Sequence, residues 1–105
     1  MEYVVRIAAR VEGPCADEFA NAVLAELVEI DSSADMAAGN AGVYAFWTSV
    51  FADTLEAGIA AGADGIRTAV QLALRKPESR LWPRQIYASS IEAYPADESA
   101  ELALL

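Results

Sequence analysis

The chain has 105 residues, of which 55% are hydrophobic and 22% charged, a composition typical of one globular domain rather than of a disordered segment. Its formal net charge of −9 opposes binding to nucleic acid and to anionic membrane surfaces, so we expect neither as a partner. An acidic surface of this kind favours solubility or a basic protein partner.

Residues 2–12 alternate with a period of two between an apolar and a mixed phase, which predicts a half-buried strand. The mixed phase contains Arg6 and Arg10. Gly13 ends the strand, and we expect Pro14 in the first turn of a helix. The first ten residues have no basic leader, and Arg6 interrupts their apolar run. We therefore expect neither a signal peptide nor a membrane helix, and a cytoplasmic location.

Residues 15–30 change to the helical period, with Asp17 and Glu18 in the first turn, where the helix dipole favours negative charge. The predicted buried face consists of Ala16, Phe19, Ala20, Val23, Leu24, Leu27 and Ile30.

A weak strand is predicted at 33–38, followed by a turn at 39–42 and by the second arm of a hairpin, "GVYAFWTSVFAD" (42–53). Asp53 is expected to cap the next helix, because Glu56 follows it at capping-box spacing.

Residues 54–76 form the second predicted helix, which Pro77 ends. Gly58, Gly62 and Gly65 each weaken this helix by about 1 kcal/mol relative to Ala. We expect them to allow a close approach to the sheet or to the other helix. The predicted apolar face consists of Leu55, Ile59, Ala63, Ile66, Val70, Ala73 and Leu74.

A last strand, "RQIYASSIEAY" (84–94), is closed by Pro95 and followed by a tail at 96–105. The order β-α-β-β-α-β within residues 1–95 predicts a single α+β domain of the ferredoxin-like type. Such a sandwich has a four-stranded antiparallel sheet in the order 4-1-3-2, with both helices on one face.

The third strand is apolar on both faces, and either phase leaves at least two aromatic rings outside the helix-covered core. The pattern leaves open which phase that is. A second copy that packs sheet to sheet is the simplest cover for such a surface. The predicted interaction surface consists of Tyr44, Phe46, Trp47, Arg6 and Arg10.

Common enzymatic chemistry is disfavoured, because the chain has no histidine and one cysteine. Cys15 lies where a helix start favours a thiolate, but Asp17 and Glu18 oppose that charge and no second cysteine is present. We therefore expect no catalytic residue, no metal site and no cofactor.

The segment "RKPESRLWPR" (75–84) concentrates four of the seven basic residues. It could bind an anion or an acidic partner with Trp82 as a stacking surface, or its tryptophan could pack under the sheet edge. The candidate patch consists of Arg75, Lys76, Arg80, Trp82 and Arg84.

The run Tyr44-Ala45-Phe46 resembles the third-strand motif of RNA recognition domains, which share this strand order. The motif's leading basic residue and its glycine are out of register, and Ser49 stands where an aromatic residue is expected. With the net charge, these departures indicate that RNA is not the partner.

Two functions remain as hypotheses. The first is a small non-catalytic homodimer that binds another protein through its sheet or helix surface. The second is a dimer of the α+β-barrel type, in which two such sheets enclose a pocket that binds or oxidises a small apolar molecule without a cofactor.

Overall fold

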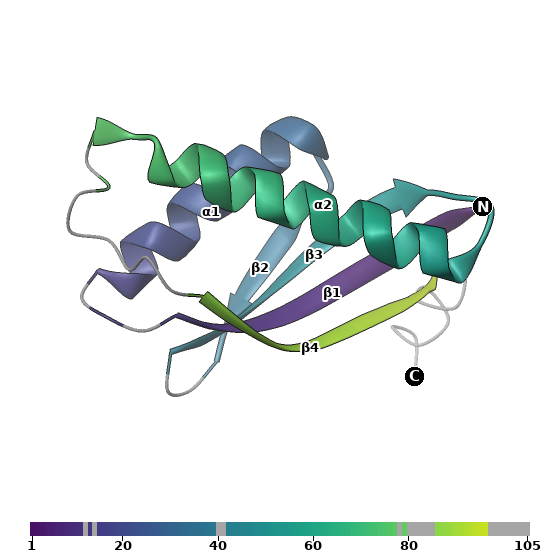
Figure 1. Cartoon of the computed structure of the whole chain (residues 1–105), viewed down its shortest axis with the longest axis horizontal. Helices are drawn as coiled ribbons and strands as arrows, with labels where there is room; N and C mark the ends of the chain where they lie inside the picture. Colours follow the sequence, from purple (N-terminus) through teal and green to yellow (C-terminus); the bar gives the residue numbers. More distant parts are fainter. Residues whose placement is uncertain (12, 14, 40–41, 78, 80–85, 97–105) are drawn as a thin grey trace.

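A computed structural model describes residues 1–11, 13, 15–39, 42–77, 79 and 86–96. Both helices lie on the same side of one sheet (Figure 1). The elements in chain order are β1 (Glu2–Val11), α1 (Ala16–Ile30), β2 (Asp35–Ala38), β3 (Val43–Phe51), α2 (Leu55–Leu74) and β4 (Ile86–Pro95). The predicted element order is confirmed.

The sheet has four antiparallel strands in the order β2-β3-β1-β4, which is the predicted order read from the other edge. The fold therefore belongs to the α+β class. The central strand β1 pairs with β3 on one side and with β4 on the other, and the β4 register shifts between Ala8 and Ala9.

The phase of the central strands follows from burial and register. Val5 is fully buried under the helices, and Ile7, two residues on, pairs with Phe46 of β3. Directly paired residues point to the same face of a sheet. Phe46 and Tyr44, which are 3% and 5% exposed, therefore face the helices, while Trp47 faces the other way.

The core combines the inward residues of β1 and β3 with one side of each helix. The predicted face of α1 is largely confirmed, since Phe19, Val23 and Leu27 are fully buried. The prediction that Ile30 is buried is wrong, because Ile30 is 51% exposed at the last position of the helix. Leu55, the first residue of α2, is likewise 42% exposed. Helical periodicity identifies a common face, but burial at a helix end requires a neighbouring element beside it.

The predicted cap of the second helix is wrong by one residue. Thr54, not Asp53, is the N-cap of α2, and its hydroxyl oxygen accepts a hydrogen bond from the Ala57 amide at 3.1 Å. Thr54 has extended backbone angles and Leu55 begins the helix, so Asp53 lies one position too early to cap it.

Two of the three glycines of α2 allow the helix to contact β1. A Cβ on Gly62 would lie 2.6 Å from the Cβ of Val5, and one on Gly58 would lie 3.1 Å from the Tyr3 ring. Gly65 has no such neighbour, since a Cβ there meets nothing within 4 Å. The predicted close approach thus holds for Gly58 and Gly62 but not for Gly65.

We expect Gly62→Ala to lower the free energy of unfolding by about 1–3 kcal/mol, because Val5 can make room only by shifting the backbone of a central strand. The matched control, Gly65→Ala, should instead raise it by about 0.5–1 kcal/mol through helix propensity alone. Urea denaturation at one protein concentration measures both changes. Equal effects of the two substitutions would show that α2 does not rest on β1 at Gly62.

Candidate functional site

The face of the sheet opposite the helices, here called the open face, is the candidate site. Side-chain alternation and strand register assign its members. They are Asp35 and Ala37 of β2, Val43, Ala45, Trp47, Ser49 and Phe51 of β3, Glu2, Val4, Arg6, Ala8 and Arg10 of β1, and Tyr87, Ser90, Glu92 and Tyr94 of β4.

One row of large side chains crosses all four strands and is here called the ridge; it consists of Asp35, Trp47, Arg6 and Glu92. The Arg6 guanidinium carbon lies 5.4 Å from the centroid of the Trp47 ring, within the range of a cation–π interaction. A guanidinium nitrogen of Arg6 also lies 3.8 Å from a Glu92 carboxylate oxygen. Arg6 therefore links β3 to β4 across β1.

The next row of the open face consists of small residues and is here called the furrow; its members are Ala37, Ala45, Ala8 and Ser90. Ala8 and Ala45 are only 7% and 6% exposed, although both α1 and α2 lie on the other side of the sheet. The larger side chains of the neighbouring rows flank these small residues. The open face is thus a ridge beside a shallow furrow.

Aromatic rings surround these two rows. Phe51 is 79% exposed and Tyr87 49% exposed, and Tyr94 pairs with Val4 near the other end of β4. The sequence alone does not indicate that the β4 rings share a face, because period-two alternation would place Tyr87 and Tyr94, seven residues apart, on opposite faces. The register shift of β4 between them brings both rings to the open face. A surface on which aromatic rings and a few charged side chains lie together is suited to contact with another protein surface.

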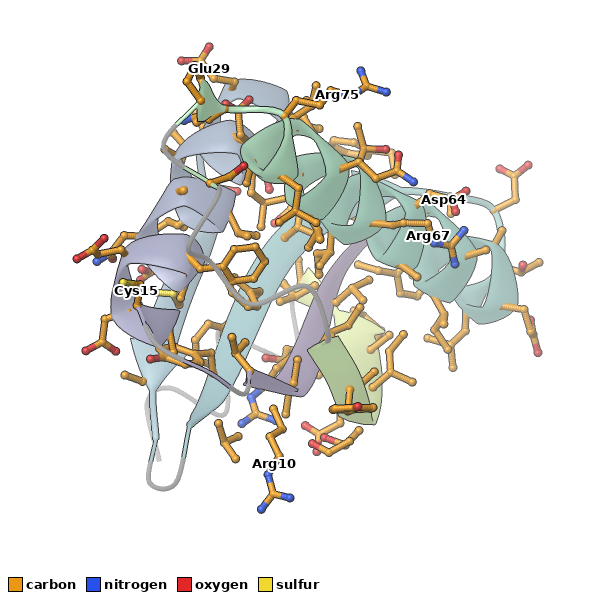
Figure 2. The ribbon with its side chains drawn as sticks, turned by 60° about the vertical axis from the view of Figure 1, so that its left-hand side comes forward. Arg10, Cys15, Glu29, Asp64, Arg67 and Arg75 are labelled. Carbon is orange, nitrogen blue, oxygen red and sulfur yellow. The ribbon has the colours of Figure 1, made fainter. Side chains whose placement is uncertain are left out.

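The residues of the predicted interaction surface divide between the two faces. Trp47, Arg6 and Arg10 lie on the open face, and Arg10 extends from β1 away from both helices (Figure 2). Tyr44 and Phe46 lie in the core and cannot contact a partner. The sequence could not separate the two groups, because both phases of β3 are apolar.

Tyr44 connects β3 to the start of α1. Its hydroxyl donates a hydrogen bond to the Asp17 carboxylate. That hydrogen bond, together with burial and the charge of Asp17, raises the pKa of Tyr44 to about 12. Asp17 is therefore a structural partner rather than an available base.

Asp31 connects the end of α1 to β3. Its carboxylate accepts hydrogen bonds from the Ser49 amide at 2.7 Å, the Thr48 hydroxyl at 3.1 Å, and the amide and hydroxyl of Ser33 at 3.0 and 2.7 Å. Burial alone would raise the pKa of Asp31, but the four hydrogen bonds outweigh it and hold the pKa below its ordinary value. The carboxylate is saturated with donors, which indicates a structural role.

The structure describes two residues of the candidate basic patch, Arg75 and Lys76. Arg75 is exposed at the end of α2, and Lys76 forms an ion pair with Glu26 of α1 at 3.2 Å. Arg80, Trp82 and Arg84 lie outside the described residues.

Cys15 is the N-cap of α1 and has left-handed backbone angles, with φ at 61°. Its side chain forms no capping hydrogen bond and packs partly buried against the core. Within the described ranges, no group of three Cys, Asp or Glu side chains is placed to hold a metal ion.

Comparison with protein-family models, with curated proteins and with solved structures finds no match for this chain. In the described part of the chain, neither helix is long and apolar enough to cross a membrane. The function is therefore inferred from the residues of the site itself.

The Asp31 hydrogen bonds predict a specific acid sensitivity. Because the folded-state pKa of Asp31 lies below its ordinary value of 3.8, the contribution of Asp31 to stability is complete above pH 3.8 and is lost as the pH falls through the folded-state pKa. Asp31→Asn should lower the free energy of unfolding by about 1–3 kcal/mol at neutral pH. Its deficit relative to wild type should shrink at about pH 3.

Urea denaturation at both pH values measures this difference, with Asp53→Asn as the control because Asp53 is exposed. A deficit of the same size at both pH values would contradict the assignment of a charged, hydrogen-bonded Asp31.

Proposed function

We propose that this chain is a ferredoxin-like, non-catalytic domain of the cytoplasm that forms a homodimer by packing open face on open face about a twofold axis. The observation that carries the proposal is the set of rings on the open face: Trp47, Phe51, Tyr87 and Tyr94. Full burial of a large apolar side chain contributes about 1.5–3 kcal/mol, so covering these rings strongly favours association.

The ridge and the furrow give the open face a shape that is complementary to the open face of a second copy. A twofold axis that runs parallel to the rows, between the ridge and the furrow, brings the ridge of each copy against the furrow of the other. Trp47 then packs against Ala45 of the second copy, and Glu92 approaches Ser90. Large side chains opposite small ones allow two sheets to approach to about 10 Å, the usual separation of packed sheets.

The charges of the open face also permit self-association. The chain as a whole has a net charge of −9, which would keep two copies apart if it were spread evenly. On the open face, however, Arg6 and Arg10 nearly balance Glu2, Asp35 and Glu92. Most of the carboxylates of the described residues therefore lie off the open face.

The size of the open face suits a small dimer. Strands about 4.8 Å apart with about 3.4 Å per residue have a projected area of roughly 500 Å² over the run from Glu2 to Arg10. The accessible surface of such a pleated, ring-bearing area exceeds its projection. It approaches the roughly 800 Å² per partner that standard interfaces bury.

The helix side supports the second part of the proposal, which is binding of another protein. Exposed carboxylates are spaced along both helices, whereas most of the open face is uncharged. A basic protein surface is complementary to such an array and would leave the dimer contact free. The exposed carboxylates that could take part are Glu18, Glu29 and Glu56.

Sedimentation equilibrium at micromolar concentration tests the dimer. We expect wild type to sediment as a dimer and Trp47→Lys as a folded monomer, because the new charge would be buried against Ala45 of the second copy. Phe46→Lys, one position away, should instead unfold the domain, since Phe46 is in the core. Circular dichroism separates the two outcomes.

Two further variants examine the geometry of the contact. Ala45→Leu fills the furrow and should weaken the dimer at least about tenfold without unfolding the protein. Gln71→Lys adds the same charge as Trp47→Lys on the exposed surface of α2 and should leave the dimer intact. A monomeric wild type, or a Trp47→Lys variant that still dimerises, would refute the proposal.

A further inference from the structure

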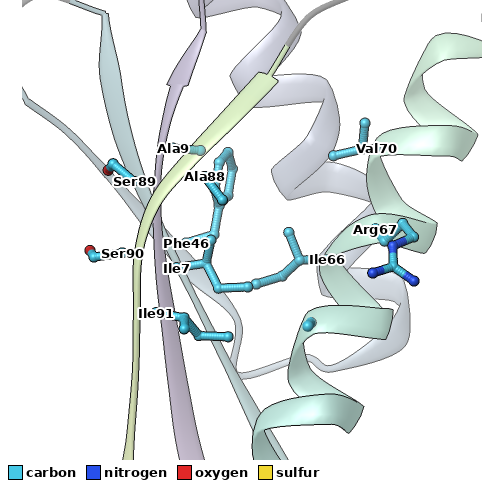
Figure 3. A pocket seen from close by; sticks show the side chains of 11 residues that line it. Ile7, Ala9, Phe46, Ile66, Arg67, Val70, Ala88, Ser89, Ser90 and Ile91 are labelled. Atoms are coloured by element: carbon cyan, nitrogen blue, oxygen red, sulfur yellow. The ribbon is translucent and has the colours of Figure 1, made fainter.

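A cavity of about 530 Å³ lies on the helix side of the sheet, between α2 and β4 (Figure 3). Its floor is formed by Ile7 and Phe46 of the two central strands, which are 8% and 3% exposed. The cavity therefore extends from the sheet edge to the core. Its remaining apolar lining consists of Ala9, Ala63, Ile66, Val70, Ala88 and Ile91.

The cavity results from how α2 is held. Gly62 rests directly on Val5 of β1, and further along the helix Ala69 and Ala73 are fully buried in the core shared with α1. The helix thus packs against α1 and the central strands and also contacts β4. Beneath it, β4 contributes the small side chain of Ala88, which does not fill the space.

The polar residues of the lining do not direct their polar groups inward. The side chains of Ser89 and Ser90 point away from the cavity, and the Ser89 hydroxyl donates to the Ala8 carbonyl at 3.1 Å (Figure 3). The Arg67 guanidinium lies at the solvent side of α2 and pairs with Asp64 at 3.3 Å. The side chains that face the cavity from the described residues are therefore apolar.

We propose that this cavity binds a neutral, largely apolar small molecule, independently of the dimer. Its volume falls within the roughly 300–1,000 Å³ of small-molecule sites, and apolar cavities of about 150 Å³ already bind benzene. A charged ligand would lose its hydration in the cavity without gaining a hydrogen-bond partner. A protein surface would need a broader contact than this recess provides.

The route of entry is along β4. Ala88 is exposed and Ile91 is 44% exposed, whereas the floor residues are buried. A ligand that enters over this edge passes between β4 and α2 without crossing the open face. The site is thus distinct from a pocket enclosed between two sheets.

Naphthalene, which is neutral and larger than benzene, serves as the probe for the full-length protein. In ¹H–¹⁵N correlation spectra, we expect it to shift the amides of Ile66, Val70, Ala88 and Ile91 saturably. Ala88→Phe, which fills the cavity from an exposed strand position, should weaken binding at least about tenfold. Val70→Phe fills it from the helix and provides a second variant if the first does not fold.

The matched control is Ala60→Phe, an exposed position of α2 outside the lining, which should bind as wild type does. Trp47→Lys should also bind normally, so the loss of the dimer and the loss of the ligand site are separate results. Absence of saturable shifts, or shifts centred on Val4 and Ala45, would overturn the proposal. The proposal of a neutral ligand would be overturned if 1-naphthoate bound more tightly than naphthalene and if Arg67→Gln abolished that difference.

Discussion

The contact between Gly62 of α2 and Val5 of β1 determines the arrangement of much of the remaining structure. The helix lies so close to β1 that the Val5 side chain occupies the space a Gly62 side chain would need, and Val5 therefore faces the helices. The antiparallel register then places Thr48, opposite Val5, on the same side. Its neighbour Trp47 must point to the open face, and so must Arg6. One helix–strand contact thus decides which aromatic rings are core and which are surface.

The two helices are attached to the sheet by different means. Two carboxylates fasten α1 to β3, with Asp17 near the start of the helix binding the Tyr44 hydroxyl and Asp31 at its end binding Thr48 and Ser49. Shape alone seats α2 on β1. With α2 packed on β1 at Gly62, the small side chain of Ala88 on β4 leaves the space over it open.

The molecule consequently presents two surfaces that differ in shape and in chemistry. The open face is broad, bears rings in relief and has nearly balanced charges around Arg6. The cavity on the helix side is lined by apolar side chains and reaches Phe46. A broad surface is complementary to a protein and an apolar recess to a small molecule, so the two proposals require different partners and can succeed or fail separately.

The sequence by itself determined the order of the elements and most of the buried face of α1, because periods of two and of 3.6 are local properties of a chain. The strand order followed from the β-α-β-β-α-β order of those elements and the sheet topology that this order favours. Tertiary structure decided the phase of β3, since Tyr44 and Trp47 are both apolar and only a helix on one side distinguishes them. It also decided that α2 begins at Leu55, which makes Thr54 the N-cap. It decided as well that Gly62 contacts β1 while Gly65 does not. The donors that saturate Asp31 and the cavity beneath α2 arise between segments distant in sequence, and no local pattern contains such contacts.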